Sequence, residues 1–364
     1  MWALLNSSAC LDPASLHEAD AVRLKAAVGS FLRDLADIGY LSVAVGPQAC
    51  SETMKLLAGR TELARRDGSL FLAVETSGRV FGGLIHGFEP SDRVKDLGTA
   101  LRRGDLIGAV AVSEPAEPGV ASNLRTAAVE EDSDYIVNGR KSFVTNGPIA
   151  DFIAVVGLVG DRPAVFLVEQ RQEGVVLGPR LETLGYNGLA VCTLELRSVR
   201  VSRDLVLGPF EDPAFLDFIH LEEDLALALA SVGLMERVIA ESKRYANTHE
   251  RGGKPIFAHQ EIRFKLAEML TLCQTAQLLV YRASWLRTVS DPEATTLVCC
   301  AKVFAAEASE SVANMGMQIM AGRGYLSGNV VEQAYRDAKY AALAGTTSEI
   351  ARMSVADDLL SRYP

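Results

Sequence analysis

The chain of 364 residues is 49% hydrophobic and 23% charged, a composition typical of a soluble globular protein, which excludes a wholly disordered or fibrous chain. Its length favours two or three domains. Thirty-six basic and 46 acidic residues give a formal net charge of -10 without a long basic run, so nucleic acid and anionic membranes are poor candidate partners.

The cysteines and the apolar runs of the sequence indicate the cellular location that we expect for the protein. Six cysteines occur without a CxxC pair, and there are only five histidines, so the sequence predicts neither a zinc site nor a disulfide framework. Reduced thiols favour a cytoplasmic location. The first twenty residues lack a basic leader, and the most apolar stretch, residues 225–235, is shorter than the roughly 18 residues that span a membrane. We expect a core helix there and no membrane insertion.

The hydrophobic period changes twice along the chain. Apolar residues at three- and four-residue steps predict a helix over 21–38, and the first hundred residues are expected to be mostly helical. Short runs rich in Val, Ile, Phe and Thr follow, with turn signals such as Asn138-Gly139 and Gly160-Asp161, which predicts an antiparallel β domain. The helical period then returns, and helices are expected near 217–246, 258–289, 292–320 and 347–361.

These changes predict an α+β fold that is mainly α and has three domains. The expected boundaries are 1–105 for an N-terminal helical domain, 106–213 for the β domain and 214–364 for a C-terminal helical domain. No segment is a strong motif by itself, because the chain has no Walker loop, GxSxG, HExxH or GxGxxG. The residues alone therefore indicate a three-part protein and no particular activity.

A set of segments in fixed order resembles the acyl-CoA dehydrogenase family of FAD enzymes. In that family an N-terminal helical domain, a middle β domain and a C-terminal four-helix bundle enclose the flavin, which is the order predicted above. The segments are AVSEP at 111–115, YIVNGRKSFVTNG at 135–147, GKPIFAHQEIRFKLAEM at 253–269, MQIMAGRGY at 317–325, YRDAK at 335–339 and TSEIAR at 347–352.

The resemblance places four β-domain residues against the flavin ring. Val112 and Ser113 would lie along the isoalloxazine edge, with Ser113 where the family usually has a threonine. Phe143 would pack on the flavin, and Thr145 would bring a hydroxyl near its reactive nitrogen. The structural alternative is a core phenylalanine and a hydroxyl at a strand edge.

The resemblance also assigns C-terminal residues to FAD. Gln318 and Gly322 would approach the FAD of a neighbouring subunit, which implies a homodimer or homotetramer. Thr347 and Glu349 would contact the pyrophosphate and ribose of the chain's own FAD near a helix N-terminus. A capping threonine and a first-turn glutamate are the structural alternative, and the two interpretations are compatible.

One FAD contact departs from the family pattern. Where the family commonly has RxxFGKPI, His249 replaces the arginine that pairs with the FAD pyrophosphate, and Gly252 replaces the phenylalanine. Arg251 is a candidate substitute for the absent arginine.

The family's commonest catalytic base is also absent. Gly345 stands where YEGTSEI has its glutamate, so it would keep only a backbone N–H for the thioester oxygen. Some branches carry the base at the start of an apolar helix of the bundle, and that register places Glu223 at the relocated position. Desolvation beside an apolar run would raise its pKa. A solvated first-turn glutamate is the structural alternative, and Glu222 and Asp224 point about 100° to either side.

The implied activity is FAD-dependent α,β-dehydrogenation of an acyl thioester, on CoA or a carrier protein, to a 2-enoyl thioester. Glu223 and Gly345 would be the catalytic pair, and electrons would pass to an electron-transfer flavoprotein. The alternatives are a flavin oxidase or monooxygenase on the same fold, recognised by rapid reoxidation in air, and a non-catalytic thioester-binding homologue, recognised by a colourless protein.

Overall fold

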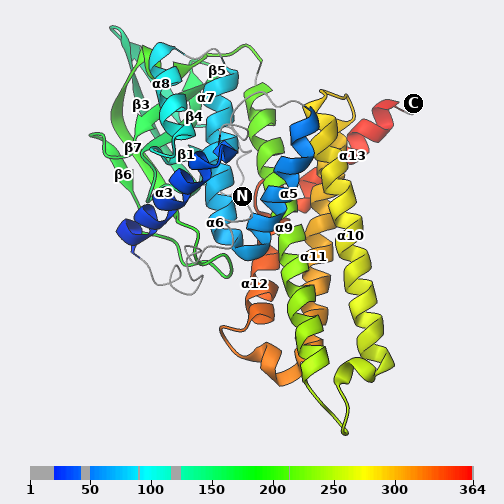
Figure 1. Ribbon diagram of the computed structural model, residues 1–364. Helices are drawn as coiled ribbons and strands as arrows, with labels where there is room; N and C mark the ends of the chain where they lie inside the picture. Colours follow the sequence, from blue (N-terminus) through cyan, green and yellow to red (C-terminus); the bar gives the residue numbers. More distant parts are fainter. Residues whose placement is uncertain (1–19, 42–49, 89–90, 116–123, 213, 363–364) are drawn as a thin grey trace. The chain divides into compact units, whose positions relative to one another are not determined.

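The computed structural model describes residues 20–41, 50–88, 91–115, 124–212 and 214–362 (Figure 1). The chain forms two compact units that interleave in sequence. The predicted boundaries at 105 and 213 stay a prediction, because these units follow contacts rather than chain order. Unit 1 comprises Met1–Pro47, Ala73–Glu182 and Asn187–Ile219, and unit 2 comprises Gln48–Leu72, Thr183–Tyr186 and His220–Pro364.

The helices of the first hundred residues confirm the predicted helical character. The predicted helix over 21–38 is α3 (Ala21–Asp37), which begins where the Asp20 carboxylate accepts the Arg23 N–H at 2.8 Å. Its buried face carries Leu24, Val28 and Leu32. The remaining segments are α5 (Cys50–Arg66), α6 (Gly68–Glu75), the π-helical η1 (Thr76–Phe81), α7 (Gly82–Gly87) and α8 (Asp92–Arg102).

In the described part of the β domain, eight strands form one sheet with the order β6-β7-β3-β2-β4-β5-β8, and β1 pairs with β4. The prediction of a purely antiparallel domain is wrong in one respect, because β1 and β2 both run parallel to β4. Parallel neighbours need a longer connection than a hairpin, and here those connections contain other strands of the sheet. The strands are β1 (Gly108–Ala111), β2 (Ala127–Glu131), β3 (Asp134–Thr145), β4 (Phe152–Val159), β5 (Arg162–Glu169), β6 (Val175–Leu177), β7 (Val191–Ser202) and β8 (Val206–Leu207).

One of the two predicted turns is a turn and the other is not. Gly160, with φ +64°, opens the β4–β5 turn as predicted. Asn138-Gly139 instead lies inside β3, at a shift in its register with β7, and the Asn138 Oδ1 accepts the Ser198 N–H at 2.8 Å. A Cβ on Gly139 would lie 2.3 Å from the Thr126 Oγ1. This glycine therefore permits close packing rather than a reversal of the chain.

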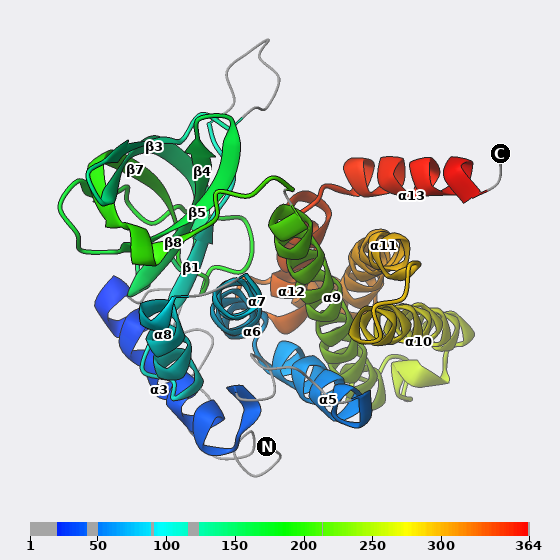
Figure 2. The same ribbon diagram turned by 90° about the horizontal axis from the view of Figure 1, so that it is seen from above.

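Unit 2 contains the long helices expected for the C-terminal bundle together with α5, and these helices run side by side (Figure 1; Figure 2 views them from above). A Cβ on Gly316 of α11 would lie 2.6 Å from Val238 of α9, so this glycine lets the two helices approach closely. Gly233 of α9 likewise lets α9 and α5 approach closely. Among the described residues, no helix is both long and apolar enough to cross a membrane. The helices are α9 (Ala214–Thr248), α10 (Gln260–Thr288), α11 (Ala294–Met320), α12 (Val330–Leu343) and α13 (Ser348–Arg362), with 3-10 turns η3 (Ile256–Ala258) and η4 (Ala321–Tyr325).

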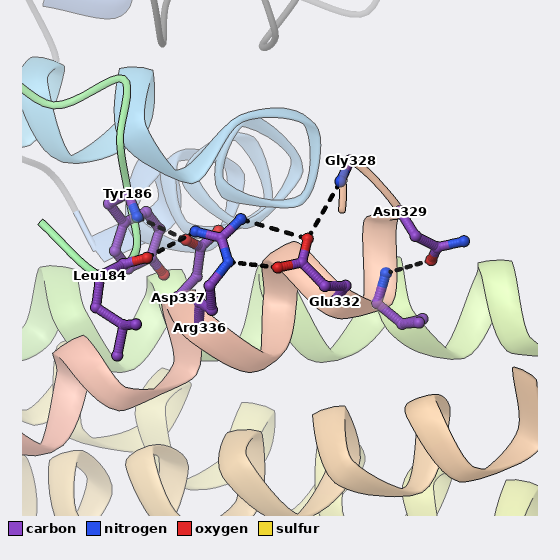
Figure 3. Close-up of polar contacts among 8 residues, drawn as sticks. Leu184, Tyr186, Gly328, Asn329, Glu332, Arg336 and Asp337 are labelled. Carbon is purple, nitrogen blue, oxygen red and sulfur yellow. Dashed lines mark hydrogen bonds and ion pairs between the residues drawn. The ribbon is translucent and has the colours of Figure 1, made fainter. Parts of the chain in front are cut away.

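The YRDAK segment lies on α12 and is structural (Figure 3). The Asp337 Oδ1 accepts the Tyr186 N–H at 2.5 Å, and the Arg336 Nη1 donates to the Leu184 carbonyl at 2.6 Å. The Arg336 Nε also donates to Glu332, one turn earlier, at 2.6 Å. A Cβ on Gly185 would lie 2.7 Å from the α12 backbone. The side chains of Arg336 and Asp337 thus hold residues 184–186 against α12 through the backbone groups of Leu184 and Tyr186.

Candidate functional site

Glu223 lies nine residues after the start of α9, immediately before its alanine-rich run. It is half-buried and not in the first turn, so the alternative of a solvated first-turn glutamate does not hold. Burial and the carboxylate of Asp224 raise the pKa of Glu223 to about 7, while the charge of Lys302 opposes this shift. A carboxylate with such a pKa is suited to take a proton near neutral pH.

The two neighbouring carboxylates have other partners. Glu222 is buried, and its Oε1 accepts a hydrogen bond from the Arg287 Nε of α10 at 2.9 Å. Asp224 is buried as well, and its Oδ1 accepts the Thr346 N–H at 3.0 Å. Because successive side chains leave a helix about 100° apart, the three carboxylates face different neighbours. Glu222 is already held in an ion pair, which favours Glu223 over Glu222 as a base.

Gly345 lies directly beside Glu223, in the connection between α12 and α13. A Cβ on Gly345 would be 3.7 Å from the Glu223 Cβ, so the two positions that the sequence resemblance predicts for the catalytic carboxylate are adjacent. The same Cβ would lie only 2.7 Å from the Asp224 Oδ1, and the φ of Gly345 is +60°. A side chain at 345 is therefore disfavoured both by the backbone and by Asp224.

Lys302 of α11 binds the same connection from another side. Its side chain is fully buried, and its Nζ donates to the Ala344 carbonyl at 3.1 Å. The Nζ also lies 3.6 Å from the Asp224 Oδ1. Burial raises the pKa of Asp224 and lowers that of Lys302, and the charge of each opposes the shift of the other. We define Asp224, Lys302 and residues 344–346 as the bundle clamp.

Sequence reasoning placed Asp224 on the helix but assigned no role to it or to Lys302. The available signal was a lone charged residue in an otherwise apolar helical segment, since Lys302 is the only charged residue in 294–306. A charged side chain in such a segment needs a partner when it is buried. The partner could not be identified because it lies on a different helix, far away in the sequence.

Phe143 of β3 is presented to solvent. It is 72% exposed, so it is not a core phenylalanine. The register of β3 against β7 shifts between Lys141 and Val144, and within this bulge Phe143 has φ +54°. A non-glycine residue in this region of the backbone is uncommon and costs energy. An aromatic side chain held outward in a strained bulge is typical of a ligand-facing position.

Val112 and Ser113 follow β1 and lie beside this bulge in unit 1. The Ser142 N–H donates to the Ser113 carbonyl at 2.8 Å, and the Lys141 Nζ donates to the Val112 carbonyl at 2.8 Å. Ser113 is exposed and Val112 is half-buried. Unit 1 therefore brings Val112, Ser113 and the segment that carries Phe143 together.

Thr145 lies at the end of β3, two residues beyond Phe143 in unit 1. It is half-buried and pairs with Val191 of β7. A half-buried hydroxyl at a strand end agrees with the structural alternative and leaves the side chain partly accessible.

A second buried lysine organises this region. The Lys141 side chain is fully buried, and its Nζ lies 2.7 Å from the Glu114 Oε1. Glu114 also accepts the N–H groups of Arg125 and Thr126, at 2.8 and 3.0 Å. Burial would raise the pKa of Glu114, but its hydrogen bonds with Lys141 and Thr126 lower it overall. We define Lys141, Glu114 and Val112 as the β-domain clamp.

His249 and Arg251 lie at an exposed hairpin between α9 and α10. Gly252 and Gly253, with φ +65° and +77°, form its tip, and the Arg251 N–H donates to the Lys254 carbonyl at 2.9 Å. The His249 ring stacks on Tyr245 with centroids 4.8 Å apart. The structure thus gives His249 a packing role on the helix, while Arg251 is exposed on the hairpin.

The remaining predicted residues lie around α11 and α13. Gln318 and Gly322 are exposed at the C-terminal end of α11 and in η4. The Thr347 Oγ1 accepts the Ile350 N–H at 3.4 Å, so Thr347 caps α13, and Glu349 is exposed in its first turn. The capping interpretation and a contact with an anion at this helix end remain compatible.

Two family models match the chain. The model described as "Acyl-CoA dehydrogenase, middle domain" matches residues 109–199, and "Acyl-CoA dehydrogenase, C-terminal domain" matches residues 221–360. Together with the helical, β and helical-bundle architecture, these matches define the class of protein, a flavin-dependent oxidoreductase.

Known proteins are similar over most of the chain. Benzylmalonyl-CoA dehydrogenase of Aromatoleum aromaticum is 29% identical, over 91% of this chain and 90% of its own. A 3-(aryl)acrylate reductase of Clostridium sporogenes is 32% identical, over 71% and 70%. An acyl-CoA dehydrogenase of Bacillus anthracis, solved in complex with FAD, has a TM-score of 0.87 at 22% identity, over 99% of this chain and 65% of its own. The chain belongs to the acyl-CoA dehydrogenase family, whose cofactor is FAD.

Proposed function

We propose that the protein dehydrogenates an acyl thioester between its α and β carbons, with FAD as the hydride acceptor. The observation that carries this proposal is the adjacency of Glu223, whose pKa is raised to about 7, to Gly345, where the family has its usual carboxylate. A base on α9 can reach the space that a side chain at 345 would otherwise occupy. The family membership supports the class of reaction.

The residues around this space have separate roles in the reaction. Glu223 takes the proton from the α carbon, and the Gly345 N–H donates a hydrogen bond to the thioester oxygen, which stabilises the negative charge that develops there. The bonding electrons of the lost α C–H form the C=C bond, and a hydride leaves the β carbon. FAD, when bound, accepts that hydride.

The residues present fit a flavin. In unit 1, an exposed aromatic ring at Phe143 and the exposed Ser113 lie on neighbouring, fixed segments, as a planar ring with polar edges requires. We assign the flavin ring to Val112, Ser113, Phe143 and Thr145, and the pyrophosphate and ribose to Thr347 and Glu349. His249 and Arg251 are assigned to the pyrophosphate, and Gln318 and Gly322 to the FAD of a neighbouring subunit. Arg251 takes the place of the arginine that the family has at 249.

The remaining parts of the proposal concern partners. The substrate is a thioester of CoA or of a carrier protein, and reduced flavin passes its electrons to an electron-transfer flavoprotein. We propose a homodimer or homotetramer, supported by large apolar side chains that are exposed along α13, among them Ile350, Met353 and Leu360. A cytoplasmic location is supported by the free thiols of Cys192, Cys273 and Cys299.

An anaerobic absorbance titration tests the proposal. The purified holoprotein is mixed with straight and branched acyl-CoA and acyl-carrier thioesters, and bleaching of the flavin band identifies both the activity and the substrate class. The absence of bleaching with every thioester would contradict the proposed activity. Rapid reoxidation in air with formation of peroxide would show an oxidase instead, and a colourless protein that cannot take up FAD would show a non-catalytic homologue.

A further inference from the structure

The connection between α12 and α13 is held at two consecutive peptide groups from two different helices. Asp224 of α9 accepts the Thr346 N–H at 3.0 Å, and Lys302 of α11 donates to the Ala344 carbonyl at 3.1 Å. Gly345 lies between these two hydrogen bonds. Both holding side chains are buried, so water does not compete strongly for the groups they bind.

We propose that Asp224 and Lys302 are positioning residues that fix the Gly345 backbone beside Glu223 and balance the charge around that glutamate. This inference rests on the proposed function, in which Glu223 is the base and the Gly345 N–H is the oxyanion donor. Asp224 also occupies the space next to Gly345, since a Cβ there would lie 2.7 Å from its Oδ1. The same aspartate thus holds the connection and keeps a side chain out of position 345.

The opposite charges of the bundle clamp act on Glu223 in opposite senses. The negative charge of Asp224 favours the protonated form of Glu223, and the positive charge of Lys302 favours the ionised form. The Nζ and Oδ1 are 3.6 Å apart, longer than a direct hydrogen bond. The two groups form an ion pair at this distance, and each charge still acts on the pKa of Glu223 in its own direction.

Other charged or titratable groups near this region lie on all the neighbouring helices. On α9, Glu222 is paired with Arg287 of α10, which largely cancels its charge. On α11, burial raises the pKa of Cys299 to about 11, so this thiol is neutral at pH 7. Asp224 and Lys302 therefore dominate, and the further groups that act on them are His220 of α9 and Glu349 of α13.

Four variants of the full-length holoprotein test the proposal. Asp224→Asn keeps an oxygen for the Thr346 N–H but loses the charge, and Lys302→Met removes both the charge and the donor. The third variant combines the two. Lys339→Met is the matched control, because it removes a lysine of α12 whose partner, Glu310, is outside the site. The rate of anaerobic flavin reduction is measured from pH 5.5 to 9 for each protein, with FAD content and thermal unfolding.

The proposal predicts opposite shifts of the pH midpoint. Asp224→Asn moves the midpoint of the rate profile to lower pH by about one unit, Lys302→Met moves it to higher pH, and the double variant lies between them. Lys339→Met leaves the midpoint in place. A role limited to folding would lower thermal stability and FAD content without moving any midpoint.

The outcomes separate this inference from the proposed function. If Asp224→Asn reduces its flavin with the parent's midpoint, the proposed charge balance around Glu223 is wrong and the inference is overturned, even when Lys302→Met fails to fold. Glu223→Gln is made in parallel. If its flavin bleaches at the parent rate, the proposed base is wrong, and the inference that rests on this base is wrong as well. If Glu223→Gln is inactive while both clamp variants keep the parent's profile, only the inference is overturned.

Discussion

Two fully buried lysines, one in each unit, have the same kinds of partner but different proposed roles. Lys141 of unit 1 and Lys302 of unit 2 each lie beside one carboxylate and donate to one backbone carbonyl, that of Val112 and that of Ala344. In each case the carbonyl belongs to a segment that carries predicted site residues. A buried lysine is costly unless it is paired, so both positions need their partners.

The two clamps differ in how completely their charges are compensated. In the β-domain clamp the Nζ is 2.7 Å from Glu114, and the pKa of this carboxylate is lowered. In the bundle clamp the corresponding distance is 3.6 Å, and burial raises the pKa of Asp224 despite the lysine. The close ion pair of the β-domain clamp stabilises the fold. The longer ion pair of the bundle clamp leaves an electrostatic field that acts on Glu223. The distance to the lysine and the burial of the carboxylate together separate these two roles, since Asp224 is buried and Glu114 is half-buried.

The largest expected effect comes from breaking the close pair. Lys141→Met leaves Glu114 without its cation, and removing one partner of a buried pair costs about 3–5 kcal/mol. We expect a large fall in the free energy of unfolding and in FAD content, with an unchanged pH midpoint for the flavin that remains bound. Denaturant unfolding measures the first, and the absorbance ratio of flavin to protein measures the second. Parent-like stability would show that this pair is not structural.

A smaller effect is expected from filling the space between Gly345 and Asp224. Gly345→Ala places a Cβ 2.7 Å from the Asp224 Oδ1, which is a steric clash. Because the φ of this residue is +60°, the substitution also adds backbone strain of about 1–2 kcal/mol. Gly160→Ala is the matched control, because its φ is +64° and nothing lies within 4 Å of the added Cβ. We expect Gly345→Ala to be the less stable variant and to reduce its flavin more slowly. Equal stabilities of the two variants would mean that Asp224 does not crowd position 345.

The smallest expected effect is on the pH dependence of stability. The pKa of folded Glu223 is about 7, above its ordinary value of 4.5, so the folded state holds this proton more tightly than the unfolded state does. Its contribution to stability is present below pH 4.5 and is lost as pH rises through 7. Because the side chain is half-buried, we expect on the order of 1 kcal/mol. The contribution of Glu114, whose pKa is lowered, has the opposite sign and is lost as pH falls.

Thermal unfolding from pH 4 to 8 checks this sign. Glu223→Gln has no such titration, so its stability relative to the parent should rise with pH through this range. A difference that stays constant from pH 4 to 8 would show that the pKa of Glu223 is not raised. The same titration should increase the parent's rate of flavin reduction with pH through about 7.

The order of helical and β regions was largely predictable from the sequence because short runs rich in Val, Ile, Phe and Thr distinguish the strands from the helical segments on either side. α12 was not among the predicted helices, although its buried residues, including Ala334, Ala338 and Ala341, recur on one face. The short strands β6 and β8 contain three and two residues, too few to show an alternating pattern. Asn138-Gly139 was misinterpreted as a turn because a bulge and a hairpin use the same residues.

The candidate site was predictable only in part. The resemblance to the family, aligned along the apolar helix, points to Glu223, and the structure adds its adjacency to Gly345. The pairing of Asp224 with Lys302 joins two helices, and no local pattern in either helix specifies the other. Glu114 and Lys141 lie inside segments that resemble the family, yet only the folded sheet shows that they bind each other.

The most direct test of the central claim follows the α proton itself. A thioester that cannot be oxidised at its β carbon is incubated with the holoprotein in D2O, and exchange of its α hydrogen is followed by NMR. We expect exchange by the parent protein, exchange within about tenfold of the parent by Glu222→Gln, and a loss of about 10²–10⁴-fold in Glu223→Gln, the range for removing a general base. Exchange by Glu223→Gln at the parent rate would show that another group removes the α proton.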